Sequence, residues 1–88
     1  MAEMVIRNSD VLSLELCVPE GHQHLRATLE LEGGTRIVLQ EATVANLVRA
    51  YVTLITSPTR RSLRLRGQAV APRDLKEGFA PWQLIEEE

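Results

Sequence analysis

Apolar residues recur at every second position along two stretches near the start of the chain, residues 11–18 and residues 24–31. The apolar members of this alternation are Leu12, Leu14, Leu16, Val18, Leu25, Ala27, Leu29 and Leu31. The polar or small residues between them are Ser13, Glu15, Cys17, Arg26, Thr28 and Glu30. A period of two residues with one apolar face is typical of a half-buried β-strand. Pro19-Glu20-Gly21 separates the two predicted strands, because proline cannot donate to a strand ladder and glycine permits a turn.

A third strand is predicted over residues 35–40, and two loop lengths could join it to the second. A two-residue loop, Gly33-Gly34, would place Leu31 opposite Arg36. A three-residue loop over 32–34 instead gives the pairs Leu29–Ile37, Ala27–Leu39 and Glu30–Arg36. That register keeps apolar residues together and pairs opposite charges, so we favour it. The expected turn is type I followed by Gly34 in the left-handed conformation.

The next segment, 43–57, has the spacing of an amphipathic helix. Its apolar positions follow the helical repeat at Val44, Leu47, Val48, Tyr51, Val52 and Ile55. Thr43 is the expected N-cap, and Ser57 before Pro58 is the expected end. Many of the residues are β-branched and form helices poorly, so the helix depends on packing, and its second half could fray or form a strand.

The remaining residues predict a fourth strand over 62–66 and an irregular C-terminal extension that begins with a helical turn at 72–76. The fold class is therefore α+β, with the order β-β-β-α-β in one small domain, 1–88. We expect an antiparallel meander with the helix packed on one face and the fourth strand alongside. Either outer strand of the meander could be its neighbour. Residues 1–10 and 86–88 are expected to fray.

The composition of the chain limits the possible cellular locations of the protein more than its possible functions. The chain has 88 residues, one cysteine and a formal net charge of −2. A single cysteine excludes an internal disulfide, and no apolar run approaches the roughly 20 residues that span a bilayer. The first four residues lack the basic and apolar pattern of a signal peptide. We therefore expect a cytoplasmic protein without a membrane segment and without a cofactor.

Four arginines form the densest charge cluster of the chain, with no acidic residue between them: Arg60, Arg61, Arg64 and Arg66. On a strand, Arg60, Arg64 and Arg66 would share one face and could bind phosphate groups of a nucleic acid or another anion. The chain as a whole is acidic, however, and no aromatic residue is interleaved for base stacking. The favoured interpretation is an edge strand protected by charge, with its arginines paired to glutamates of a neighbour.

A second candidate site combines Cys17, His22 and His24, which are residue types that bind zinc. A structural zinc site needs four ligands, so Glu20 or a partner chain would have to complete it. We favour solvated histidines and a small half-buried cysteine. No nucleophile, base and orienting group stand together in the sequence, so we do not expect an enzyme.

The third candidate is the bulky apolar group Phe79, Pro81 and Trp82 near the C-terminus. These residues could dock on the chain's own core or contact a second subunit, where tryptophan is often central. The sheet face opposite the helix also lacks a covering layer. Together these features favour a non-catalytic interaction module that forms a homodimer. Nucleic-acid or anion binding is the alternative, and metal binding is the third hypothesis.

Overall fold

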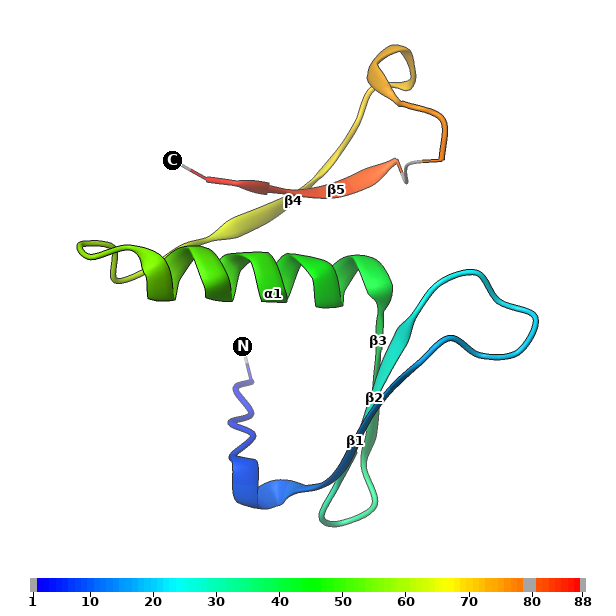
Figure 1. The fold of residues 1–88 in the computed structure, drawn as a ribbon, viewed down its shortest axis with the longest axis vertical. Helices are drawn as coiled ribbons and strands as arrows, with labels where there is room; N and C mark the ends of the chain where they lie inside the picture. Colours follow the sequence, from blue (N-terminus) through cyan, green and yellow to red (C-terminus); the bar gives the residue numbers. More distant parts are fainter. Residues whose placement is uncertain (1, 79–80, 88) are drawn as a thin grey trace. The chain divides into compact units, whose positions relative to one another are not determined.

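The computed structural model describes residues 2–78 and 81–87, and it has the α+β composition and the strand order that the sequence predicts (Figure 1). The helices and strands are η1 (Asn8–Asp10), β1 (Val11–Cys17), β2 (Arg26–Leu31), β3 (Arg36–Gln40), α1 (Glu41–Thr56), β4 (Leu65–Ala69), η2 (Pro72–Asp74) and β5 (Trp82–Glu86). The chain divides into two compact units, Met1–Leu47 and Val48–Glu88, and each unit is described by itself. None of the described helices is both long and apolar enough to cross a lipid bilayer.

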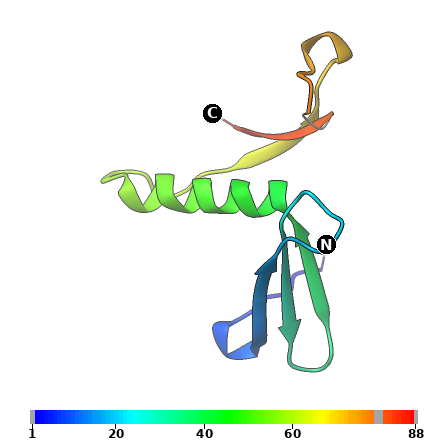
Figure 2. The same cartoon turned by 45° about the vertical axis from the view of Figure 1, so that its right-hand side comes forward.

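The first unit contains a three-stranded antiparallel sheet in the order β1-β2-β3, whose strands lie side by side in Figures 1 and 2. The predicted hairpin register is confirmed by the pairs Leu29–Ile37, Ala27–Leu39 and Glu30–Arg36. The amide of Leu31 donates to the carbonyl of Thr35 over 2.8 Å, which closes the three-residue loop. The predicted type I turn is wrong, because Gly33 has a φ of +90° as well as Gly34 at +88°. A positive φ at the third position of the turn belongs to type II.

The start of β1 departs from regular pairing. Val11 pairs with Leu31 and Ser13 pairs with Glu30, so the strand contains a bulge at Leu12. Just before it, the amide of Glu32 donates to the carbonyl of Asp10 over 2.9 Å. The short helix η1 is thereby joined to the end of β2, and residues 8–10, which were expected to fray, form ordered structure.

The buried core of the described residues is very small. Ala27 and Leu31, both on the central strand β2, are its buried apolar side chains, at 4% and 6% exposed. The leucines of β1 that the alternation predicts to face inward are exposed instead: Leu12, Leu14 and Leu16. Alternation along the chain therefore identifies a face of the sheet, but it does not provide the layer that would bury that face.

The helix α1 is complete over 16 residues, so its second half is helical, and it begins at Glu41, two residues before the predicted cap. Five of its large apolar side chains are exposed, from 47% at Val52 to 64% at Tyr51, while Val44 and Leu54 are half-buried. We call the exposed set the apolar stripe of α1; it consists of Leu47, Val48, Tyr51, Val52 and Ile55. The helical repeat shows that this face needs an apolar neighbour, but it does not specify which surface provides one.

The second unit contains a separate two-stranded antiparallel sheet, β4-β5. The prediction that the fourth strand joins the first sheet is wrong, because β4 pairs with β5 and begins at Leu65 instead of Ser62. Gly67 lies inside β4 opposite Leu84. The irregular extension predicted after β4 supplies this partner strand, since Trp82–Glu86 forms β5.

Candidate functional site

The arginine cluster lies at the start of the β4-β5 hairpin. Because β4 begins at Leu65, only Arg66 of the four arginines lies in a strand, and the other three precede it. The prediction that Arg60, Arg64 and Arg66 lie along one face of a strand is therefore wrong, because Arg60 and Arg64 precede β4. The cluster still occupies one short segment, 60–66, and the carbonyl of Arg64 accepts a hydrogen bond from the amide of Glu87 over 2.9 Å.

Two carboxylates at the C-terminal end of the hairpin neutralise half of this cluster. The Nη2 atom of Arg60 lies 2.6 Å from Oε1 of Glu86, and Nη2 of Arg66 lies 3.5 Å from Oε1 of Glu87. The ladder brings these groups together because Glu86 lies opposite Leu65. Glu86 and Glu87 were expected to belong to a tail and instead end the hairpin. Among the residues that the structure describes, Arg61 and Arg64 form no salt bridge.

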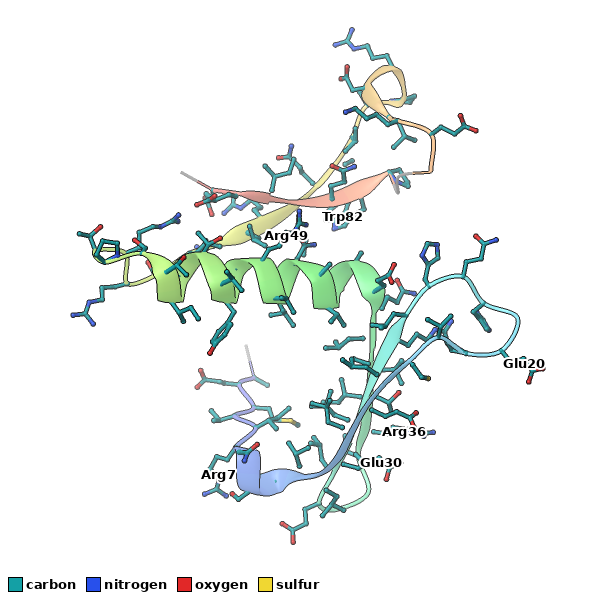
Figure 3. The ribbon with its side chains drawn as sticks, in the orientation of Figure 1. Arg7, Glu20, Glu30, Arg36, Arg49 and Trp82 are labelled. Atoms are coloured by element: carbon teal, nitrogen blue, oxygen red, sulfur yellow. The ribbon has the colours of Figure 1, made fainter. Side chains whose placement is uncertain are left out.

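Trp82 lies on β5, and its indole ring covers Gly67 of the neighbouring strand (Figure 3 labels Trp82). A Cβ atom added at Gly67 would lie only 2.6 Å from Nε1 of the ring. The tryptophan is nevertheless 62% exposed. Trp82 lies opposite Ala69 in the ladder, and Leu84 lies opposite Gly67. Because Ala69 and Gly67 are two residues apart, Trp82 lies on the same sheet face as Gly67 and on the opposite face from Arg66. Trp82 therefore docks in part on its own hairpin. Pro81 is exposed, and Phe79 lies outside the described residues.

The predicted metal ligands are not gathered into a site. Across residues 2–78 and 81–87, no group of three or more histidine, cysteine, aspartate or glutamate side chains is placed to hold a metal ion. Cys17 is exposed at the end of β1 and lies opposite Arg26. The amide of His22 donates to the carbonyl of Pro19 over 3.0 Å, which closes a turn. His24 has a different partner altogether, Glu41.

Glu41 joins the loop between β1 and β2 to the first residue of α1. Its Oε2 atom lies 3.2 Å from Nδ1 of His24, and its Oε1 atom accepts a hydrogen bond of 3.2 Å from the amide of Leu25. The bond from the Leu25 amide, and next the bond with His24, lower the pKa of the Glu41 carboxyl below its ordinary value. The sequence analysis did not identify Glu41. The available signal was an acid at the boundary between a strand and a helix, where a carboxylate favours the helix N-terminus.

A further charge pair, between Glu30 and Arg36, links β2 to β3 on the polar face of the first sheet. Nη2 of Arg36 lies 3.6 Å from Oε1 of Glu30, and Figure 3 shows the two side chains together. Both side chains are more than half exposed, so the pair contributes little to stability. Its main effect is on the register of the hairpin, because a slip of one residue would separate the two charges.

No protein-family model, curated protein or solved structure matches the chain. Three local arrangements are candidate functional surfaces: the arginine cluster with Glu86 and Glu87, the exposed Trp82, and the exposed apolar stripe of α1. All three are suited to contacts with another molecule, because they present charge or apolar surface to solvent.

We predict that the amide of Leu25 responds to the ionisation of Glu41. Because the folded-state pKa of this carboxyl is lowered, its stabilising contribution is present above the unfolded-state pKa and is lost as the pH falls through the folded-state pKa. An acid titration followed by ¹H-¹⁵N NMR should show a step in the Leu25 amide shift, with its midpoint below the ordinary glutamate range. Glu41→Gln should abolish the step, and Glu20→Gln in the same loop should keep it. A step that survives in Glu41→Gln would contradict the assignment.

A second prediction concerns the contact between Gly67 and Trp82. Gly67→Ala should displace the indole ring, because the new Cβ cannot remain 2.6–2.8 Å from three ring atoms. Trp82 is the one tryptophan of the chain, so its fluorescence emission and near-ultraviolet circular dichroism should both change. Gln68→Ala, one residue along on the opposite face, should leave both spectra unchanged. Identical spectra for Gly67→Ala and the unmodified protein would show that the ring does not cover Gly67 in solution.

Proposed function

We propose that this protein is a non-catalytic interaction module that forms a homodimer through the apolar stripe of α1. The observation that carries this proposal is the exposure of all five side chains of the stripe on a helix of 16 residues. A contiguous exposed apolar face on a small protein is typical of a protein-protein contact. A cytoplasmic location is part of the proposal, since the exposed Cys17 suits a reducing compartment.

The low helix propensity of the residues in α1 supports the proposal that a partner covers the helix. Seven of its 16 residues are β-branched: Thr43, Val44, Val48, Val52, Thr53, Ile55 and Thr56. Relative to alanine, each costs up to about 0.7 kcal/mol in a helix, so together they cost roughly 3–5 kcal/mol. Isolated helices of up to about 12–15 residues are marginal in water even when they are rich in alanine, and α1 is only slightly longer. Packing must therefore provide the stability that the residues themselves lack.

Burial of the stripe is large enough to meet this need. Fully burying a Val, Leu or Ile side chain contributes about 1.5–3 kcal/mol, and roughly half of each side chain in the stripe is still exposed. Covering the four aliphatic side chains of the stripe would contribute about 3–6 kcal/mol per copy, and covering Tyr51 adds to this. That gain is comparable to the helix cost of the β-branched residues, so a covered α1 is stable where a solvated α1 is marginal.

The hairpin of the second unit supports the same proposal. An isolated two-stranded hairpin is at best marginally stable in water, and both β4 and β5 have one edge without a strand partner among the described residues. Trp82 is 62% exposed beside them. Tryptophan is enriched among the residues that dominate binding energy at interfaces, so the hairpin provides a second place for intersubunit contact.

A second copy of the chain fits the stripe better than a charged partner does. The stripe contains no charged side chain, and the charged residues of α1, Glu41 and Arg49, lie outside it. A two-fold interface places the same patch of each subunit against its counterpart. Such a contact between two stripes brings apolar side chains together without opposing like charges. An interface of this kind needs no ligand and no reaction, which is why we propose a non-catalytic role.

The proposal predicts a mass of twice 9.9 kDa in solution and a dimer that depends on Tyr51. Tyr51→Arg places a charge at the centre of the stripe and should give a monomer in light scattering after size exclusion. Thr53→Arg is the matched control on the polar side and should remain dimeric. Arginine favours helix more than tyrosine or threonine does, so loss of helix propensity would not explain a difference.

Two results would overturn this proposal. One is an unmodified protein that remains monomeric at every accessible concentration. The other is a pair of variants, Tyr51→Arg and Thr53→Arg, with the same mass.

A further inference from the structure

The arginine cluster already binds anionic groups, and these groups come from the chain itself. Glu86 and Glu87 each present carboxylate oxygens to a guanidinium group, at 2.6 Å from Arg60 and 3.5 Å from Arg66. Carboxylates and phosphates are recognised by the same fork of arginine donors. The two C-terminal carboxylates therefore occupy positions in which phosphate oxygens would be bound.

These internal pairs are weak enough for another anion to displace them. The four side chains are between 37% and 67% exposed, so solvent screens both pairs. Exposed pairs of this kind contribute little, and their strength falls with salt. Arg61 and Arg64 add two guanidinium groups that form no salt bridge within the described residues. A polyanion could therefore bind Arg61 and Arg64 directly, and it could compete with Glu86 and Glu87 for Arg60 and Arg66.

The position of the carboxylates is set by the backbone of the hairpin. Glu86 lies opposite Leu65 in the ladder, and the amide of Glu87 donates to the carbonyl of Arg64 over 2.9 Å. These bonds do not involve the carboxylate groups. The side-chain charges of Glu86 and Glu87 can therefore be removed while the ladder that aligns β4 with β5 is kept.

We propose that Arg60, Arg61, Arg64 and Arg66 form a binding surface for the phosphate backbone of a nucleic acid, which Glu86 and Glu87 inhibit by occupying Arg60 and Arg66. Trp82 lies on the other face of the β4-β5 sheet from Arg66, so base stacking on it is not part of the contact. Binding through phosphates alone gives little sequence preference and a steep dependence on salt. This surface uses none of the residues of the apolar stripe of α1, so nucleic-acid binding can be tested independently of the dimer.

The test is fluorescence anisotropy of a labelled 20-nucleotide single-stranded DNA of mixed sequence, titrated with protein at low salt. Glu86→Gln with Glu87→Gln should bind roughly 2- to 30-fold more tightly than a matched control, the gain expected from releasing two exposed pairs. The control, Glu15→Gln with Glu20→Gln, makes the same change in net charge on exposed residues of the first unit. If two more phosphates are neutralised, the slope of log K against log salt should steepen by about 1.4.

Three results would overturn the proposal: equal affinity of the two double variants, a gain that persists after Arg60→Ala and Arg66→Ala are added, or no binding at the lowest salt. Arg61→Ala with Arg64→Ala gives a second test that leaves both carboxylate pairs and the ladder side chains in place. This variant should abolish the binding of the unmodified protein, and unchanged binding would also overturn the proposal. Light scattering on the same samples shows whether the dimer is retained, so failure of either proposal is recognised separately.

Discussion

The stability of α1 is the constraint on which the rest of the structure depends. The helix joins the strand β3 to the second unit, yet its residues favour it weakly and its apolar stripe is exposed. Ala27 and Leu31 are the buried apolar side chains of the described chain, which is a small core even for a protein of 88 residues. In the proposed dimer, a second copy covering the stripe would bury apolar surface that is exposed in the single chain.

Charge has a different role in the two units. In the first unit, Glu30 and Arg36 fix the register of a hairpin, and Glu41 connects a loop to the start of the helix through Leu25 and His24. In the second unit, the glutamates at the end of β5 neutralise part of the arginine cluster. The first set favours one local structure, while the second occupies groups that another anion could bind.

The parts of the fold that the sequence predicted are those determined by neighbours along the chain. The register of β2 and β3 followed from apolar pairs and from Glu30 opposite Arg36, because a short loop leaves few alternatives. The turn type was missed because both glycines tolerate a positive φ, so the residues permit either geometry. The partner of β4 was missed because β5 places apolar side chains, such as Leu84 and Ile85, on both faces and has no clear alternation.

The candidate sites show the same limit. The sequence identified the arginine cluster and the exposed tryptophan by composition, but it could not show that Glu86, Glu87 and Gly67 lie against them, because a 12-residue connection separates the two strands. His24 was considered as a metal ligand with Cys17, and its partner is Glu41, 17 residues further along. Contacts between distant residues depend on loop closure, which local patterns do not encode.

Hydrogen-deuterium exchange of α1 as a function of protein concentration tests the central claim most directly. The account predicts that amide protection over residues 45–55 rises with concentration, because the helix is stabilised when a second copy covers its stripe. The amide of Leu31, bonded to Thr35 within the hairpin of the first unit, is the internal reference. Protection of α1 that is the same at every concentration would contradict the account, since the helix would then need no second copy.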